Sequence, residues 1–276
     1  MLKHPTQLTR ITHNCTSFLD FPHKMRKLFN VYLQAVLLLI SFPAHAEPLK
    51  VAVAANLKYV FDDLAVEFKK ETGIETQVIP SASGKIASQV RNGAPYDVFM
   101  SADMEFPEGL YKDGYAVTLP KIYAYGIMVL WSLKEVDLSK GVAGLADTSV
   151  GKVAIANPKV APFGKQALKA MEYYKVRAVV EPKLVYGESI TQVSQYVDSK
   201  AADVGFSAKS VVTAPEMAGK GKWIEVPSES YEPIAQGIVV LKHGSETNGD
   251  AARKLFDFVM SEKARRIFAK SGYKLP

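Results

Sequence analysis

Four short segments of the chain carry small or amide side chains at points where a helix is predicted to begin. The segments are Ala55-Asn56, residues 81–84, residues 161–164 and residues 188–190. The first N–H groups of a helix lack a carbonyl partner one turn back, and the helix dipole adds about half a positive charge there. An anion can therefore bind at a helix start without a full cation. Ser and Asn are also ordinary capping residues, so a single junction is weak evidence, but four junctions converging on one cleft would form an anion cage.

The elements that must position these segments alternate between strands and helices. Residues 49–54 form a Val/Ala-rich strand, and from Leu57 the apolar residues recur at helical spacing until Gly73. A second strand over residues 75–79 is closed by Pro80. The alternation continues through strands at 97–100, 152–156, 183–186 and 203–206, with helices beginning near 83, 164 and 189. This pattern predicts an α/β fold with mostly parallel sheets, in which ligands bind beyond the carboxyl ends of the strands.

Two longer apolar runs, residues 122–131 and 234–241, are expected to be strands that cross between two lobes. We expect residues 47–126 to form lobe 1, residues 127–235 to form lobe 2, and residues 236–276 to return to lobe 1. After Asn248 the apolar residues lie on one face of a final helix, which must therefore dock, most economically on the first lobe.

Residues 1–46 are predicted to be a leader. A basic segment, Met25-Arg26-Lys27, precedes an apolar stretch over residues 28–42 and the small-residue pattern Ala44-His45-Ala46. This order is typical of a secretory signal peptide that starts at Met25. The apolar stretch is shorter than the ~20 residues that span a bilayer, although a retained anchor is the alternative. Cleavage after Ala46 would release an exported mature protein of 230 residues.

Charge and composition exclude several classes of protein. The net charge of +6 comes mainly from the first 46 residues, which hold five Lys/Arg and one Asp, so we expect no nucleic-acid binding. Residues 47–276 contain no Cys and a single histidine, His243, which is interpreted as a surface turn residue. Thiolate and multi-histidine metal sites are thereby excluded, and neither a Walker loop nor a dinucleotide fingerprint is present. We expect no enzyme activity, no cofactor and no direct metal ligand.

Several motifs together resemble a known family. Residues 51–57 read Val-Ala-Val-Ala-Ala-Asn-Leu, and residues 92–103 read Asn-Gly-Ala-Pro-Tyr-Asp-Val-Phe-Met-Ser-Ala-Asp. With residues 81–84, 154–158, 161–164, 204–206 and 269–273, they resemble the periplasmic molybdate-binding proteins of bacterial ABC transporters. The resemblance covers nearly all of the chain after the leader. It implies a two-lobed type 2 periplasmic binding protein, a monomer, that closes on molybdate or tungstate and delivers it to an inner-membrane permease.

The resemblance also implies which residues hold the anion. Two would contribute side chains, two would contribute backbone N–H groups and two would be neighbours: Asn56, Ser83, Phe163, Ile190, Ala55 and Ser189, in that order. About six hydrogen bonds to a charged acceptor, at about 1.5–3 kcal/mol each, can offset the cost of burying a dianion. Hydrogen phosphate should bind poorly, because its O–H would meet only donors.

Two positions depart from the best-known family pattern, which has a serine at Asn56 and a ligand-binding tyrosine at Ala208. Some members of the family use asparagine at the first position. For the second, either Tyr123 or Tyr125 supplies the missing donor, or the site makes one bond fewer.

Other functions stay open at this point. A receptor for sulfate or thiosulfate would need the same donors, and Glu188 keeps a carboxylate-using tungstate receptor in view. The enzyme known on this fold tethers its cofactor through a cysteine, which residues 47–276 lack. The Tyr173-Tyr174 pair could bind iron, but its helical spacing favours packing.

Overall fold

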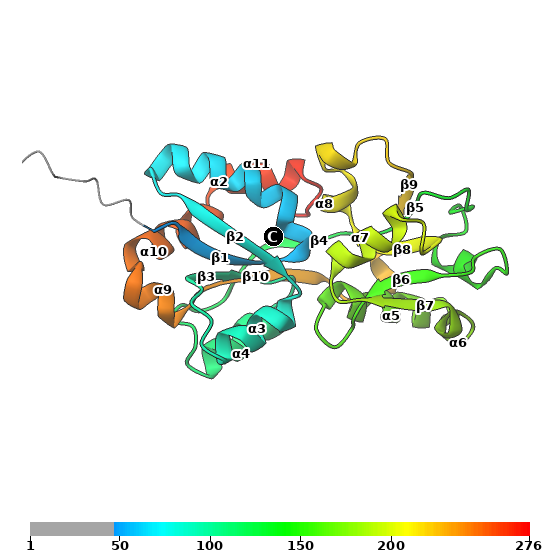
Figure 1. Ribbon diagram of the computed structural model, residues 1–276, viewed down its shortest axis with the longest axis horizontal. Helices are drawn as coiled ribbons and strands as arrows, with labels where there is room; N and C mark the ends of the chain where they lie inside the picture. Colours follow the sequence, from blue (N-terminus) through cyan, green and yellow to red (C-terminus); the bar gives the residue numbers. More distant parts are fainter. Residues whose placement is uncertain (1–46) are drawn as a thin grey trace, which may run out of the picture. The chain divides into compact units, whose positions relative to one another are not determined.

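The computed structural model describes residues 47–276, which form two five-stranded sheets with helices packed around them (Figure 1). The strands of the first sheet are β1 (Leu49–Ala54), β2 (Thr76–Ser81), β3 (Val98–Met100), β4 (Lys121–Gly126) and β10 (Ile234–Val240). Those of the second are β5 (Met128–Ser132), β6 (Val153–Ala156), β7 (Leu184–Gly187), β8 (Val204–Ala208) and β9 (Lys222–Glu225). The predicted leader lies outside the described residues.

The two sheets share one topology. Their strand orders are β2-β1-β3-β10-β4 and β7-β6-β8-β5-β9. In the first sheet β10 runs antiparallel to both of its neighbours, and in the second β5 does the same. The other four strands of each sheet therefore point the same way. The predicted α/β class with mostly parallel sheets is confirmed.

Helices connect the strands. The α-helices are α2 (Lys58–Thr72), α3 (Ser83–Arg91), α4 (Glu105–Lys112), α5 (Pro162–Tyr173), α6 (Arg177–Val180), α7 (Ile190–Asp198), α8 (Lys209–Val212), α9 (Lys242–Thr247), α10 (Gly249–Val259) and α11 (Glu262–Lys270). Short 3-10 turns are η1 (Ala55–Leu57), η2 (Gly141–Ala146), η3 (Glu181–Lys183), η4 (Pro215–Met217) and η5 (Ser228–Ser230). None of the helices within residues 47–276 has the length and apolar character needed to cross a bilayer.

Helix α2 shows how the sequence pattern produces its element. Its buried residues are Val60, Phe61, Leu64 and Phe68, the residues whose spacing predicts one apolar face. The helix ends at Gly73, which adopts a left-handed conformation (φ 73°) that glycine reaches without steric cost.

The chain passes between the sheets twice, but not as expected for both apolar runs. Residues 122–131 do cross, because β4 and β5 are separated only by Ile127. Residues 234–241 do not, since β10 lies wholly in the first sheet. The return crossing is made by residues 226–233, which contain Pro227 and Pro233 and so lack two of the N–H groups a strand needs.

Two further elements differ from the sequence-based expectation. Strand β2 continues through Pro80, which is tolerated because β2 is an edge strand. The single C-terminal helix is in fact two, α10 and α11, since Ser261 caps a new helix by accepting a hydrogen bond from the Ala264 N–H at 3.3 Å. Both pack on α2, where the Phe68 and Phe258 rings lie 5.5 Å apart.

His243 lies in the first turn of α9 rather than in a surface turn. Its Nδ1 is 3.2 Å from Oδ1 of the fully buried Asp97, which also accepts a hydrogen bond from the Lys50 backbone N–H at 2.7 Å. His243 therefore connects α9 to the start of β3.

Candidate functional site

A small cavity of about 220 Å³ lies where the two halves of the described chain meet. Its walls come from the end of β1 with η1, the β2–α3 junction, Ala102 after β3, and the starts of α5 and α7. It is smaller than the neighbouring cavity described below, so it suits only a small ligand. Six of the eight residues expected at a binding site line it: Ala55, Asn56, Ser83, Phe163, Ser189 and Ile190.

Three helices begin at this cavity without a side-chain cap. The N-cap residues of α3, α5 and α7 are Ala82, Ala161 and Ser189, and none makes a capping hydrogen bond through its side chain. Within residues 47–276 the backbone N–H groups of Phe163 and Ile190 have no acceptor. The positive ends of three helix dipoles, with free N–H donors, are therefore directed at one small space.

The start of α5 depends on two residues that a sequence can specify. Pro162 occupies the first turn, where its fixed φ suits the helix and its missing N–H costs nothing. A Cβ on Gly164 would lie 1.9 Å from the Ala156 carbonyl oxygen, so only glycine lets α5 begin this close to the end of β6. This close approach carries Phe163 to the cavity.

Ser83 is placed to donate its hydroxyl proton into the cavity. Its side chain is 1% exposed, and its Oγ accepts a hydrogen bond from the Ala102 N–H at 3.0 Å. Within residues 47–276 the hydroxyl proton itself has no acceptor. The Ala102 N–H thus fixes the oxygen and leaves the proton free.

Asn56 lines the same cavity, and its side chain and backbone carbonyl are hydrogen-bonded by residues on the side away from the cavity. Its Nδ2 donates to Gln236 Oε1 at 3.1 Å and to the Tyr273 hydroxyl at 2.9 Å. Its backbone carbonyl accepts from the hydroxyls of Tyr273 and Ser210, each at 3.0 Å. Both amide protons are used in this network, so in this arrangement the side chain offers the cavity its oxygen.

The structure does not bring the two tyrosines proposed as substitute donors to the cavity. The Tyr123 hydroxyl lies 3.0 Å from the Ser101 carbonyl oxygen and 2.9 Å from Gln236 Oε1, and burial raises its pKa. Tyr125 is half-buried at the sheet edge, where its backbone pairs with Lys274. Ala208 is buried at the end of β8 and does not line the cavity either.

No charged side chain is among the described residues that line the cavity. Two carboxylates directly adjoin lining residues in the sequence. Glu188 is exposed and paired with Lys85. Burial raises the pKa of the other, Asp103, to about 6, helped by the negative charge of Glu105. Hydrogen bonds from the Ser101 hydroxyl at 2.9 Å and the Phe106 N–H at 3.3 Å act in the opposite direction. Residues 47–276 also contain no cluster of His, Cys, Asp and Glu suited to a metal ion.

Direct contacts across the cavity rim join the two halves. The Gly84 N–H donates to the Val160 carbonyl oxygen at 2.9 Å. Ion pairs connect Lys85 with Glu188 at 2.6 Å and Lys165 with Glu105 at 2.9 Å. The side chains of both pairs are 44–67% exposed, so each contributes at most about 1 kcal/mol.

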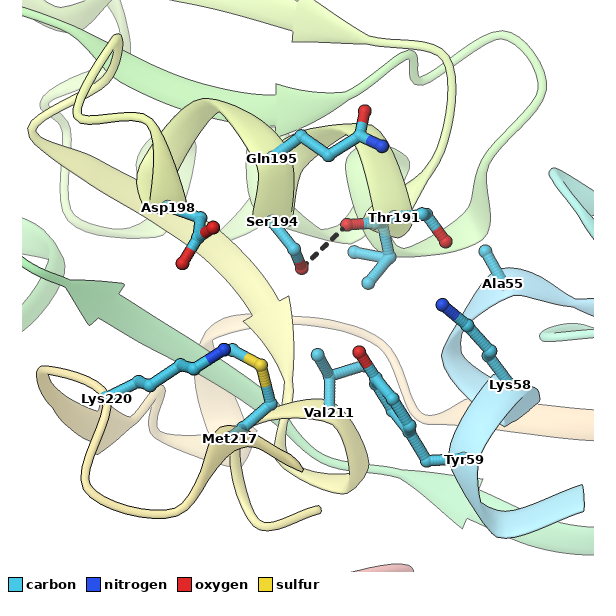
Figure 2. Close-up of a pocket in the computed structure, with 11 residues that line it drawn as sticks. Ala55, Lys58, Tyr59, Thr191, Ser194, Gln195, Asp198, Val211, Met217 and Lys220 are labelled. Carbon is cyan, nitrogen blue, oxygen red and sulfur yellow. Dashed lines mark hydrogen bonds between the residues drawn. The ribbon is translucent and has the colours of Figure 1, made fainter. Parts of the chain in front are cut away.

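A larger cavity of about 610 Å³ adjoins the first and shares Ala55 and Ile190 with it (Figure 2). It lies along the flank of α7, where the Ser194 hydroxyl already donates to the Ile190 carbonyl oxygen at 3.0 Å. Figure 2 shows the exposed Lys58 side chain directed into it. Because it receives no converging helix starts, we assign it no binding role of its own. Two lysines, Lys58 and Lys220, and one aspartate, Asp198, line it, so its net charge is positive and can attract anions toward the small cavity.

Sequence reasoning missed the residues that do not line the cavity but hydrogen-bond Asn56, which does. Gln236 is fully buried and is the single polar side chain of β10, a signal that could have singled it out within the apolar run. Tyr273 is part of a motif that carries the family resemblance, without an assigned role. The link between Ser210 and Asn56 joins residues 154 positions apart, which no local pattern indicates.

These features define a class: an α/β binding protein whose small neutral cavity lies between two sheets that the chain connects twice. Comparison with known proteins agrees. Residues 49–274 match the family described as bacterial extracellular solute-binding protein. A "Molybdate-binding protein ModA" from Rhodobacter capsulatus is 38% identical over 92% of this chain and 98% of its own length. Its namesake from Azotobacter vinelandii is 36% identical over 86% of this chain and 94% of its own length.

Among solved structures, the Azotobacter vinelandii periplasmic molybdate-binding protein superimposes with a TM-score of 0.75, at 32% identity, over 83% of this chain and 99% of that one. The chain therefore belongs to the bacterial extracellular solute-binding protein family and, within it, to the ModA type.

Proposed function

We propose that this protein captures molybdate, and tungstate as its close analogue, in the small cavity and hands it to an inner-membrane ABC permease. The observation that carries the proposal is the convergence of three uncapped helix starts and the Ser83 hydroxyl on a cavity lined only by neutral residues. The relatives named above are molybdate-binding proteins, which supplies the identity of the anion.

The arrangement suits a small dianion on physical grounds. Each free N–H or O–H donor to a charged oxygen contributes about 1.5–3 kcal/mol, and closure of the two halves over the anion would strengthen such bonds by excluding water. Donors that cannot lose a proton also favour anions that carry none. Hydrogen phosphate would bring an O–H that needs an acceptor.

We further propose that the two halves act as hinged lobes, residues 47–126 with 234–276 and residues 127–233. The boundary expected between residues 235 and 236 moves by two residues, because Ile234 and Ala235 already pair with β4 in the first sheet. The chain crosses between the sheets at Ile127 and through residues 226–233, which are the natural hinge. The contacts of Gly84, Lys85 and Lys165 across the rim would form as the lobes close on the anion. Cleavage of the leader after Ala46 would release the protein, as a monomer, into the periplasm.

A calorimetric titration of residues 47–276 with molybdate, tungstate, sulfate and phosphate tests the assignment. We expect tight binding of molybdate and tungstate and much weaker binding of sulfate and phosphate. At about a thousand times the dissociation constant, molybdate should also stabilise the fold by about 4.1 kcal/mol, seen as a higher melting temperature. Heat and stabilisation with sulfate alone would instead identify a sulfate receptor, and no response to any of the four would refute an oxyanion site.

A further inference from the structure

Gln236 has a hydrogen-bonding problem that points to a second arrangement of the site. Its side chain is 0% exposed, and its Nε2 has no acceptor. A Cβ on Gly126 would lie 2.7 Å from this nitrogen and 2.8 Å from Cζ of the Phe163 ring, so the amide faces apolar groups there. A fully buried –NH₂ group without partners is costly and rare in folded proteins.

The same amide creates a conflict at its oxygen. Gln236 Oε1 accepts from Asn56 Nδ2 at 3.1 Å and lies 2.9 Å from the Tyr123 hydroxyl. Tyr123 has one proton for two acceptors, Gln236 Oε1 and the Ser101 carbonyl oxygen at 3.0 Å. Burial raises the pKa of Tyr123, so the hydroxyl keeps that proton.

Turning both carboxamides by half a turn resolves these conflicts at the same distances. Gln236 Nε2 then donates to Asn56 Oδ1 and to the Tyr123 oxygen, and Tyr123 donates to Ser101. Tyr273 can donate to Asn56 Oδ1, because Ser210 still donates to the Asn56 carbonyl oxygen. The buried unpaired group becomes a carbonyl oxygen, which proteins tolerate better than an unpaired N–H.

The turn also changes which group of Asn56 faces the cavity. Asn56 then presents its two Nδ2 protons to the cavity in place of its oxygen. We propose, on the basis of the function proposed above, that Gln236 is a positioning residue that holds the Asn56 amide with its –NH₂ group toward the bound oxyanion. An oxyanion favours this arrangement because it accepts from Asn56, and Gln236 acts on the ligand only through Asn56.

A double-mutant cycle with Asn56→Ala and Gln236→Met tests this directly. Each single variant should weaken molybdate binding by about ten- to a hundredfold, the loss of one hydrogen bond to a charged group. The double variant should bind no more weakly than Asn56→Ala alone, since Gln236 has nothing left to position. Gln89→Met serves as the matched control: Gln89 is a half-buried glutamine outside the cavity whose Oε1 accepts from the Tyr96 hydroxyl at 3.2 Å, and its loss should leave affinity unchanged.

Additive losses in the double variant, or wild-type affinity in Gln236→Met, would overturn the proposal while leaving the oxyanion assignment intact. A wild-type protein that binds no oxyanion would instead overturn the proposed function. Should Gln236→Met not fold, ¹⁵N NMR of side-chain amides in the wild-type protein gives a second test. The Asn56 –NH₂ signals, identified by their absence in Asn56→Ala, should shift on addition of molybdate together with those of Gln236. Unshifted Asn56 signals at saturation would refute the role of the amide.

Discussion

Ser83→Ala tests two roles of one hydroxyl group: its oxygen accepts a hydrogen bond that stabilises the fold, and its proton can be donated to the anion. The Ser83 Oγ accepts the Ala102 N–H at 3.0 Å, and its proton is free to bind an anion. Substitution by alanine removes both bonds while leaving the backbone of α3 intact. The substitution should therefore cost both affinity and stability.

The two losses can be sized separately. Loss of a hydrogen bond to a dianion should weaken binding by about 1.5–3 kcal/mol, roughly ten- to a hundredfold. The Ala102 N–H, buried with its residue at 2% exposure, would be left without an acceptor, at a cost of about 1–3 kcal/mol to folding. For a chain of this size each kcal/mol lowers the melting temperature by about 2–4 °C.

Calorimetric titration with molybdate measures the first loss, and thermal unfolding without ligand measures the second. Ser207→Ala is a matched control, because Ser207 is also fully buried but its hydroxyl has no hydrogen-bond partner within residues 47–276. That variant should keep both affinity and melting temperature. If Ser83→Ala binds molybdate as tightly as the wild type, Ser83 is not a ligand, and if its melting temperature does not fall, the Ala102 bond contributes nothing.

Two further predictions concern stability. Burial raises the pKa of Asp103 from 3.8 to about 6, so between these values the folded protein holds more protons than the unfolded chain and its stability falls as the pH rises through about 6. Asp103→Asn should remove this fall, which is worth about 3 kcal/mol over the whole range and about 1.4 kcal/mol between pH 5 and pH 8. The difference in urea-unfolding free energy between pH 5 and pH 8 should therefore shrink by about that amount, and an unchanged difference would contradict the raised pKa. Gly164→Ala should cost about 1–3 kcal/mol or more, because its Cβ would meet the Ala156 carbonyl oxygen at 1.9 Å, and should also weaken molybdate binding by moving the start of α5. Gly249→Ala, where a Cβ meets nothing within 4 Å, is the control, and equal urea midpoints for the two variants would show that α5 can relax.

Local patterns predicted most of the fold because its elements are short and amphipathic or fully buried. The face of α2 and the left-handed Gly73 follow from residue spacing and type alone. The errors occurred where tertiary context decides. An apolar run such as residues 234–241 cannot show which sheet it joins, and the break at Ser261 needed the capping bond to be recognised inside a continuous apolar pattern.

For the site, the sequence could indicate the helix starts that line the cavity, but not the buried residues, such as Gln236, that hydrogen-bond the lining residues. Six expected residues line one cavity because a helix start after a strand has a fixed place in an α/β fold. The two tyrosines were proposed from the need for a hydroxyl donor. Their actual positions depend on strand register: on β4, Tyr123 is buried and Tyr125 half-buried. Gln236 reaches Asn56 only because β10 lies beside β3 in the first sheet, a long-range pairing that no short motif encodes.

Rejection of protonated anions depends on the buried residues that orient Asn56 as well as on the helix starts. A cavity of N–H and O–H donors has nothing to accept the proton of hydrogen phosphate, but a single inward-facing carbonyl oxygen would supply that acceptor. Asn56 is the residue that can present either end, and the partners that choose between them are Gln236 and Tyr273. An amide held with its nitrogen inward adds a donor for a dianion and removes the one acceptor that a protonated competitor could use. Affinity and selectivity in this cavity therefore depend on the orientation of the Asn56 amide, and Gln236 sets that orientation, through its own amide, without touching the ligand.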